Sequence, residues 1–295
     1  MDKMWQIIEQ SISDAVRISF TIKKQSSVSG GCINRAFKVQ DENYDYFVKL
    51  NDVDLLDMFE AEFEGLSEIA QSKTIAVPKP ICSGLAAGFA FIVLENLSFG
   101  SSDQAGFAML GKQLAKMHRT QQVQFGWTRD NTIGSSTQVN SQSQNWLEFW
   151  QTQRLGYQLD LAGQNGYGGS LQKKGDKLME KMSGLFPDGN PKSSLLHGDL
   201  WSGNMAILQS GTPVIFDPAV YYGDRETDIA MTELFGGFSE NFYLSYNEYY
   251  PLESGYSTRK IFYNTYHILN HLNLFGGGYG QQAESMMDKV LSELG

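Results

Sequence analysis

Cysteine and histidine are scarce in this chain, and long apolar runs are missing altogether. Its two cysteines, Cys32 and Cys82, are too few for a disulfide framework or a zinc cluster, and the spacings of its four histidines (118, 197, 267 and 271) do not suggest a metal centre. No stretch approaches the roughly 18 apolar residues of a membrane span, and no uninterrupted apolar run near Met1 indicates a signal peptide. We therefore expect a cytoplasmic protein with no membrane partner.

Positive charge is also in deficit. The chain carries 23 lysines and arginines against 33 aspartates and glutamates, a net charge of −10. A surface of this sign is unsuited to nucleic acid, so we expect no nucleic-acid partner. Hydrophobic residues make up 41% of the chain, which is ordinary for a globular protein. Its length of 295 residues is enough for one large core and favours two packed lobes.

The segment from His197 to Pro218 carries most of the functional information. Asp199 and Asn204 lie five residues apart, and Asp217 follows after two short apolar runs separated by a Gly-containing turn. Two such runs predict a β-hairpin, whose two ends lie side by side. We therefore expect Asn204 and Asp217 to converge, with Asp199 on the loop just before them. Three oxygen-bearing side chains at one point suit a hard cation that carries nucleotide phosphates.

Aspartate and asparagine often do no more than cap turns, and for any one of these residues that interpretation would suffice. Their order, however, is that of the protein-kinase pattern, in which H-x-D-L-x-x-x-N is followed by D-F-G. Four polar residues in this register therefore predict a phosphoryl-transfer site.

The first third of the chain is predicted to be a small, strand-rich lobe. Apolar spacing predicts helices over residues 4–16 and 53–71. Alternation of apolar and polar residues predicts strands, and in the third of them it places Lys49 on the opposite face from Tyr46 and Val48. The expected strands are 18–23, 35–39, 44–50 and 89–94. A Ser/Gly-rich stretch follows residue 97, so we expect lobes at 1–97 and 98–295.

The rest of the chain is predicted to be mainly helical. Asp103 has the position of an N-cap for a helix that ends near His118. Further helical patterns cover residues 144–161 and 171–182, begin again at Asp228, and extend over 258–274. The predicted fold class is therefore α+β, with a small antiparallel sheet in the N-terminal lobe and a larger helical C-terminal lobe.

Several blocks of the sequence resemble the fructosamine kinase (ketosamine kinase) family, in the aminoglycoside-phosphotransferase-like branch of the protein-kinase-like fold. The resemblance implies an ATP-dependent kinase that phosphorylates the 3-hydroxyl of a sugar linked to an amine as a ketosamine, which promotes deglycation. The implied partner is a small ketosamine or a glycated protein. The blocks are Gly30–Asn34, Phe47–Lys49, Met58–Glu62, Leu196–Asn204, Asp217–Ala219, Tyr222–Gly223, Leu234–Phe238 and Asn270–His271.

Chemistry assigns roles within the 199–217 segment. Asp199 is the candidate base, since a carboxylate within hydrogen-bond reach can orient a sugar hydroxyl and accept its proton. Asn204 and Asp217 are expected to hold Mg²⁺, which bridges phosphate oxygens. Asp217 is followed by Pro218, whose ring fixes φ. We therefore expect no mobile activation segment and a constitutively active enzyme.

Lys49 is the candidate phosphate-positioning lysine; the alternative is a solvated lysine on an edge strand. An acidic helix follows it, so a partner carboxylate is available at Glu60, Glu62 or Glu64. Glu62 is preferred because it lies four residues before Leu66, as in the family's Glu-x-x-x-Leu pattern. Any of these glutamates could instead be part of a charged helix face.

The nucleotide is expected to contact two further segments. Glycines between two strands let backbone amides approach phosphate oxygens, although this loop lacks the G-x-G-x-x-G pattern and could be an ordinary turn. Cys32 there is either an exposed thiol, which oxidation or a disulfide between two copies could turn into a block on ATP entry, or a half-buried small residue. The candidate residues are Gly30, Gly31, Cys32 and Asn34 in the loop, and Glu95, Asn96 and Leu97 beside adenine.

Five other residues are assigned to support or to the sugar. His197 is expected to support the catalytic loop by hydrogen bonding, and Asp228 to accept bonds from its backbone, which is compatible with an N-cap role. Trp201, Asn270 and His271 are candidates for the sugar side of the cleft, because an indole covers sugar C–H groups and polar side chains bind its hydroxyls. Asn270 and His271 could equally be core residues.

Two other functions remain open at this point. A kinase of the same fold could act on an aminoglycoside, choline or a free sugar, and a nucleotide-binding regulator could lack turnover. Retention of Lys49, Asp199, Asn204 and Asp217 together disfavours the regulator. The sequence does not determine which sugar and amine are linked, or whether the protein is a monomer or a homodimer.

Overall fold

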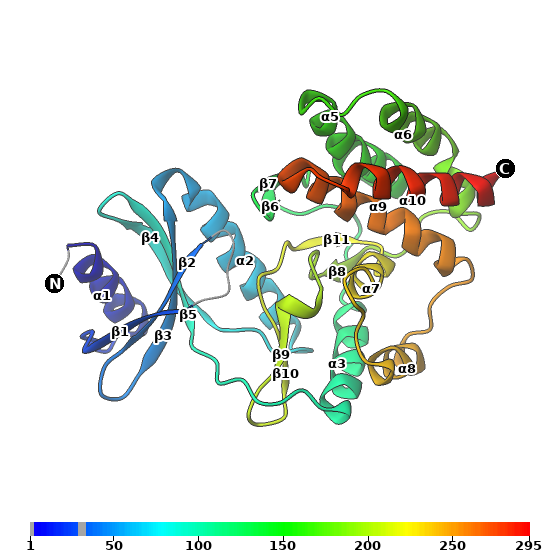
Figure 1. Ribbon diagram of the computed structural model, residues 1–295. Helices are drawn as coiled ribbons and strands as arrows, with labels where there is room; N and C mark the ends of the chain where they lie inside the picture. The colour runs from blue at the N-terminus through cyan, green and yellow to red at the C-terminus, as the bar shows by residue number, and fades with distance from the viewer. Residues whose placement is uncertain (1–2, 29–33) are drawn as a thin grey trace.

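The computed structural model describes residues 3–28 and 34–295, which form two lobes (Figure 1). The linker 96–103, called the strap below, joins them between β5 and α3. The N-terminal lobe is built on one antiparallel sheet of order β1-β2-β3-β5-β4. Its strands are β1 (Lys24–Val28), β2 (Arg35–Gln40), β3 (Asp45–Asp52), β4 (Pro80–Ala86) and β5 (Phe89–Glu95). The predicted α+β fold class is confirmed.

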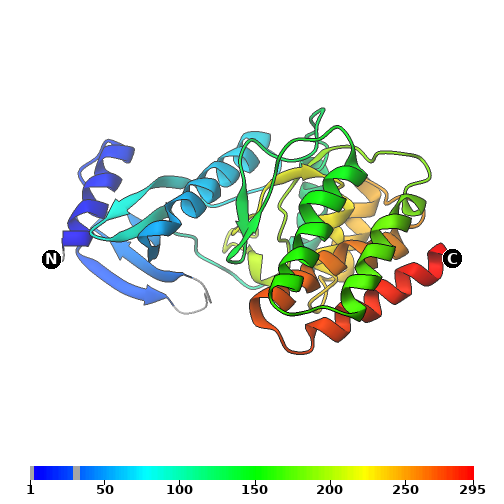
Figure 2. The same cartoon turned by 90° about the horizontal axis from the view of Figure 1, so that it is seen from above.

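A helix covers each face of this sheet. Helix α1 (Lys3–Val16) packs on the face that carries Tyr46 and Val48. Helix α2 (Leu56–Ser72), which follows a short 3₁₀ turn, packs on the opposite face, the one that carries Phe47. Lys49 reaches a glutamate of α2, so it lies on the α2 face as the alternation predicts. Figure 2 shows α1 and α2 on opposite sides of the strands.

The predicted strand over residues 18–23 is wrong, and β1 begins where that strand was expected to end. Side chains of helix α1 accept hydrogen bonds from the backbone of this segment. The Phe20 N–H donates to Ser13 Oγ (3.0 Å) and the Ile22 N–H to the Glu9 carboxylate (2.7 Å). These two N–H groups cannot also join a sheet ladder. Strand β4 was not predicted.

The C-terminal lobe is mainly helical (Figures 1 and 2). Asp103 caps α3, since its carboxylate accepts the Gly106 N–H at 2.7 Å as predicted. Helices α8 and α10 were not predicted; α8 packs on α3, and α10 packs on α9. The helices are α3 (Gln104–Met117), α4 (Trp146–Trp150), the π-helical turn Gln151–Leu155, α5 (Gly156–Gln164), α6 (Ser170–Lys181), α7 (Glu226–Thr232), α8 (Glu240–Tyr249), α9 (Tyr256–Phe275) and α10 (Tyr279–Leu294).

Three small antiparallel pairs lie between the sheet lobe and the helices. β8 (Ser194–Leu196) pairs with β11 (Tyr221–Gly223), and β9 (Met205–Ile207) pairs with β10 (Pro213–Ile215), which confirms the predicted hairpin. β6 (Asn131–Ile133) pairs with β7 (Ser136–Gln138). The lobe boundary predicted after residue 97 falls in the strap between β5 and α3 and stays a prediction. Within the described ranges, no helix has the length and apolar character needed to cross a bilayer.

Candidate active site

The loop that follows β8 and carries Asp199, the candidate catalytic loop, is held by one carboxylate of helix α7. Asp228 accepts the backbone N–H of His197 (2.7 Å) and of Gly198 (2.8 Å), and it also contacts His118 Nε2 at 3.1 Å. Gly198 has φ +85°, and a Cβ on it would lie 2.0 Å from the Ala219 carbonyl oxygen. Only glycine fits such a position, so the loop's path is fixed by local sterics as well as by Asp228.

His197 holds the loop in place with hydrogen bonds through both ring nitrogens. Its Nε2 donates to the Phe216 carbonyl (2.9 Å), while its Nδ1 accepts the Asp199 N–H (3.3 Å). Burial lowers the pKa of His197, and this neutral tautomer needs no added proton. The histidine thus links the catalytic loop to the residue that precedes Asp217.

The hairpin brings Asn204 and Asp217 together beside Asp199, as its geometry predicts. Asn204 Nδ2 donates to the Asp199 carbonyl (2.9 Å) and to its carboxylate (3.2 Å). The Phe216 N–H donates to the Asn204 carbonyl (3.0 Å), which extends the ladder to the end of the hairpin. Asp217 has φ +56°, an unusual conformation for a residue other than glycine and one that clusters at functional sites.

Lys49 reaches the same point from the sheet. Its Nζ lies 2.6 Å from Glu62 Oε1 and 2.6 Å from Asp217 Oδ1. Burial alone would lower the pKa of Lys49, but Asp217 and Glu62 outweigh it and the pKa is raised. The ammonium is therefore charged and buried on a central strand, which excludes the solvated edge lysine. Glu60 and Glu64, the alternative partners, contact Arg129.

The pKa of Asp199 lies well above that of an ordinary aspartate. Burial raises the pKa of this carboxyl to about 7, Asp217 and Asp228 add to the rise, and the Asn204 hydrogen bond opposes it. Two acids of the site thus differ in environment, because Asp217 is paired with Lys49 whereas the Asp199 carboxylate accepts from the neutral Asn204 amide.

The donor set fits Mg²⁺ bound together with phosphate. The Asn204 amide oxygen and the Asp217 carboxylate are hard oxygen donors, and magnesium is commonly held by one or two such groups plus substrate phosphates. Across 3–28 and 34–295, no group of three His, Cys, Asp or Glu side chains could hold a metal by itself. A cation held by Asn204 and Asp217 would complete its coordination with phosphate oxygens or water.

The nucleotide side is described in part. Gly30, Gly31 and Cys32 lie outside the described residues, while Asn34 Oδ1 accepts from Asn51 Nδ2 at 2.7 Å. At the start of the strap, Asn96 Nδ2 donates to Asp45 (2.9 Å). At the end of β5, the Glu95 N–H donates to the Lys79 carbonyl (2.8 Å). These bonds fix the path of residues 95–97 at the lobe junction. Phe99, which was not predicted, is exposed there.

Phe99 stacks on Phe216 with ring centroids 5.7 Å apart and an interplanar angle of 17°. The strap is therefore in contact with the residue before Asp217. An exposed aromatic on a polar, Ser/Gly-rich strap was the available signal in the sequence.

The sugar-side candidates separate into two groups. Trp201 and His271 both contact Phe235, with ring centroids 6.4 and 4.8 Å away, and Trp201 is 37% exposed. Asn270 is buried, and its amide bonds the Ile133 carbonyl and Gln158. Asn270 therefore occupies the core position that was its alternative, whereas Trp201 and His271 belong to one partly open aromatic group.

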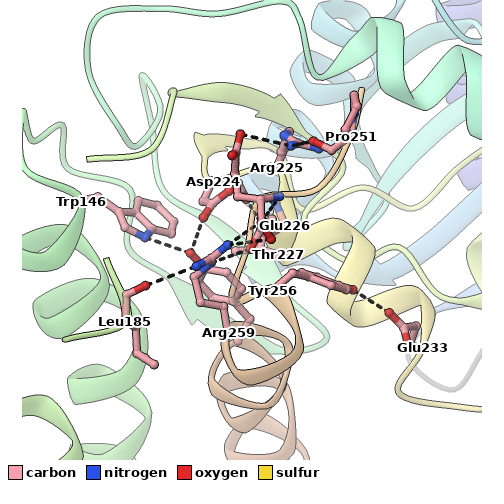
Figure 3. A network of polar contacts seen from close by, with 12 residues as sticks. Trp146, Leu185, Asp224, Arg225, Glu226, Thr227, Glu233, Pro251, Tyr256 and Arg259 are labelled. Atoms are coloured by element: carbon pink, nitrogen blue, oxygen red, sulfur yellow. Dashed lines mark hydrogen bonds and ion pairs between the residues drawn. The ribbon is translucent and has the colours of Figure 1, made fainter. Parts of the chain in front are cut away.

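Helix α7, which carries Asp228, is itself fixed by a buried ionic network. Arg259 binds Glu226 through Nε (2.7 Å) and a terminal nitrogen (3.0 Å), and Arg225 bonds carbonyls near Pro251 (Figure 3). Burial beside Glu226 raises the pKa of Asp224 to about 6. These contacts hold α7, and with it Asp228, against α9.

Sequence reasoning missed a set of amides that hold the chain after Asp217. Gln138 Nε2 donates to the Ala219 carbonyl (3.1 Å), and Asn131 Nδ2 to the Val220 carbonyl (2.8 Å). These residues lie on β6 and β7 in a stretch that looks like a polar loop in the sequence. Their only signal was the number of amide side chains between residues 131 and 140.

Comparison with known proteins decides the family. The family model described as fructosamine kinase matches residues 4–293, nearly the whole chain. The chain belongs to the fructosamine kinase family.

Relatives within the family are similar over most of their length. A protein of Synechocystis sp. named "Probable ketoamine kinase" is 49% identical over 288 residues, 97% of each chain. A chloroplastic protein-ribulosamine 3-kinase of Arabidopsis thaliana is 44% identical and covers 92% of this chain and 84% of its own. These names describe the relatives.

Solved structures agree with the fructosamine kinase assignment. A crystal structure from Haemophilus somnus, named "Putative fructosamine-3-kinase", is 31% identical, with a TM-score of 0.90 and 98% of both chains covered. The aminoglycoside phosphotransferase APH(4)-Ia, solved with AMP-PNP and hygromycin B, has a TM-score of 0.67 at 13% identity over 97% of this chain and 98% of its own. That likeness shows the kinase-like fold alone.

Proposed function

We propose that this protein is an ATP-dependent kinase that phosphorylates a sugar hydroxyl, the 3-OH, of ketosamines such as fructosamines or ribulosamines, and so promotes their deglycation. The observation that carries the proposal is the meeting of Lys49, Asp199, Asn204 and Asp217 at the lobe junction of a fructosamine kinase family member. The family and the kinase-like fold imply ATP as the phosphoryl donor.

Asp199 is proposed to orient the attacking hydroxyl and accept its proton. Phosphoryl transfer passes through a loose transition state, so the proton moves late and positioning contributes more than basicity. A carboxylate with a pKa near 7 is ionised in about half of the molecules at neutrality and is a stronger acceptor than an ordinary aspartate.

Lys49, Asn204 and Asp217 are proposed to receive the nucleotide's phosphates. Lys49 is held by Glu62, so its charge stays at the junction when Asp217 turns to another cation. Mg²⁺, when bound, would neutralise charge on the phosphate oxygens. Asn204 and Asp217 would hold it, and Asn204 also keeps Asp199 in place through its amide nitrogen.

Trp201 and His271 are proposed to line the sugar side, next to Phe235. An indole that is partly open can cover the apolar face of a sugar, and the imidazole can bond its hydroxyls. His271 Nδ1 bonds the His267 carbonyl at 2.8 Å, which leaves Nε2 as the atom available for substrate. Burial lowers the pKa of His271, so the ring is neutral at working pH.

A substrate panel with MgATP tests the proposal. We expect turnover with fructosamines and ribulosamines, linked to a free amino acid or to a protein, and an NMR spectrum that places the new phosphate on carbon 3. Turnover only with aminoglycosides, choline or free sugars would instead support a different small-molecule kinase. Nucleotide binding without any turnover would support a regulator. The same panel shows which sugar and amine are preferred.

A further inference from the structure

Helix α2 belongs to the N-terminal lobe, yet its C-terminal end is bonded to the other lobe. Glu68 accepts the Trp127 indole N–H at 2.5 Å and the Tyr222 hydroxyl at 2.8 Å. Burial and Glu68 both raise the pKa of Tyr222, so this hydroxyl stays a proton donor at any working pH. One carboxylate thus joins α2 to two separate segments of the C-terminal lobe.

A second attachment lies nearer the start of α2. Arg129 of the C-terminal lobe binds Asp57, lies 3.7 Å from Glu60 and binds Glu64 at 2.7 Å. The three acids stand at helical spacing on one face and repel one another without a cation. Arg129 is the basic side chain that the structure pairs with these acids of α2.

Between the two attachments α2 touches the chain that follows Asp217. A Cβ on Gly65 would lie 3.0 Å from a Val220 methyl, so the helix has almost no freedom to move closer. Val220 and Tyr222 follow Asp217 by three and five residues. The position of α2 is therefore set directly against the segment that carries Asp217, and Glu62 lies within the stretch that these contacts define.

We propose that Arg129 is a positioning residue for nucleotide binding, which together with the Glu68 contacts clamps α2 to the C-terminal lobe so that Glu62 holds Lys49 in place. The clamp is built from permanent charges and hydrogen bonds, so it needs no activation event. It acts through Lys49 and touches no substrate. This inference extends the proposed kinase function, since it concerns how the nucleotide side of that site is held.

The test is the affinity for MgATP, measured by calorimetry without any phosphoryl acceptor. Arg129→Gln removes the cation, and we expect the Kd to rise about threefold to tenfold, as loss of about 0.7–1.4 kcal/mol would produce. Lys174→Gln is the matched control: Lys174 also pairs two carboxylates, Glu284 and Asp288, but in the C-terminal lobe between α6 and α10. Its Kd should equal that of the parent protein.

A second variant removes the carboxylates of α2 that Arg129 binds. In the triple variant Asp57→Asn, Glu60→Gln, Glu64→Gln, Arg129 has no carboxylate to bind, so adding Arg129→Gln should leave the Kd unchanged. An unchanged Kd in the single Arg129→Gln variant, or the full effect of Arg129→Gln in the neutralised background, would overturn the proposal. Because no acceptor is present, failure of the ketosamine panel and failure of the clamp are separate results.

Discussion

The catalytic loop and helix α2 each position charged groups of the site, but the contacts that hold them differ in burial. The loop rests on Asp228, His118 and His197, whose side chains are at most 1% exposed. Helix α2 is tied across the lobe boundary by Arg129 to Asp57 and Glu64, whose side chains are 78% and 50% exposed. A buried anchor costs much to break and tolerates little change, whereas exposed ion pairs are screened by salt and are individually weak.

This difference suits the two tasks of the proposed site. In the proposed mechanism the hydroxyl, Asp199 and the phosphate must be aligned closely, because small misplacements reduce the rate steeply. The nucleotide must enter and leave, which requires some freedom of the sheet lobe against the helical lobe. We therefore expect damage to the loop to lower kcat and damage to the α2 clamp to raise the Kd for nucleotide.

Replacing Asp199 by asparagine should have the largest effect. The amide keeps the shape but cannot accept a proton, so we expect kcat to fall about 10²- to 10⁴-fold while MgATP affinity stays close to that of the parent protein. Steady-state kinetics with calorimetry check both quantities. Removal of a buried carboxylate should also raise Tm at pH 8. An unaffected kcat would remove Asp199 from the role of base.

Asp228→Asn should have the next largest effect. Its amide nitrogen would face one of the two backbone N–H groups of His197 and Gly198 and leave that donor unpaired, which costs about 1–3 kcal/mol of stability. We expect kcat to fall about 10- to 100-fold as the loop shifts, with little change in MgATP Kd. Equal losses in kcat and nucleotide affinity would contradict the separation of the two regions.

The parts of this site that could be predicted are those encoded over short stretches. The hairpin spacing placed Asn204 beside Asp217, and strand alternation placed Lys49 on the α2 face. The strand predicted over residues 18–23 was wrong because this segment packs against α1 and bonds to it instead of pairing in the sheet.

The α2 clamp could not be predicted for a different reason. Arg129 and its partners are about 65 to 72 residues apart in the chain, and an exposed Arg or Glu has no periodicity that indicates its partner. The amides of β6 and β7 are similar, because their acceptors are backbone carbonyls about 80 to 90 residues away. Asn270 was ambiguous in sequence, and only its depth placed it in the core.

The pH profile offers a smaller effect that reports on the loop alone. Because the pKa of Asp199 is raised to about 7, its active ionised form is lost as pH falls, and kcat/KM for ATP should drop towards tenfold per pH unit below that value. The Asp199→Asn variant should lack this limb.

The sign for stability is the reverse of that for activity. A carboxyl whose pKa is raised on folding destabilises the native state when ionised, and the penalty disappears as pH falls from 7 towards the unfolded value near 3.8. The Tm advantage of Asp199→Asn should therefore be largest above pH 7 and shrink in acid. A Tm advantage that does not vary with pH would show that Asp199 is not buried as an ion.

Tyr222→Phe should produce the smallest change and the sharpest comparison. It removes one hydroxyl that donates to Glu68 across the lobes, worth about 1 kcal/mol, so we expect the MgATP Kd to rise about twofold to fivefold with kcat unchanged. Tyr256→Phe is the control, since the Tyr256 hydroxyl also donates to a glutamate, Glu233, at 2.6 Å, but within the C-terminal lobe (Figure 3). If both variants shift the Kd equally, the shift reflects general stability. The Tyr222–Glu68 contact then has no separate role in holding the nucleotide side of the proposed site.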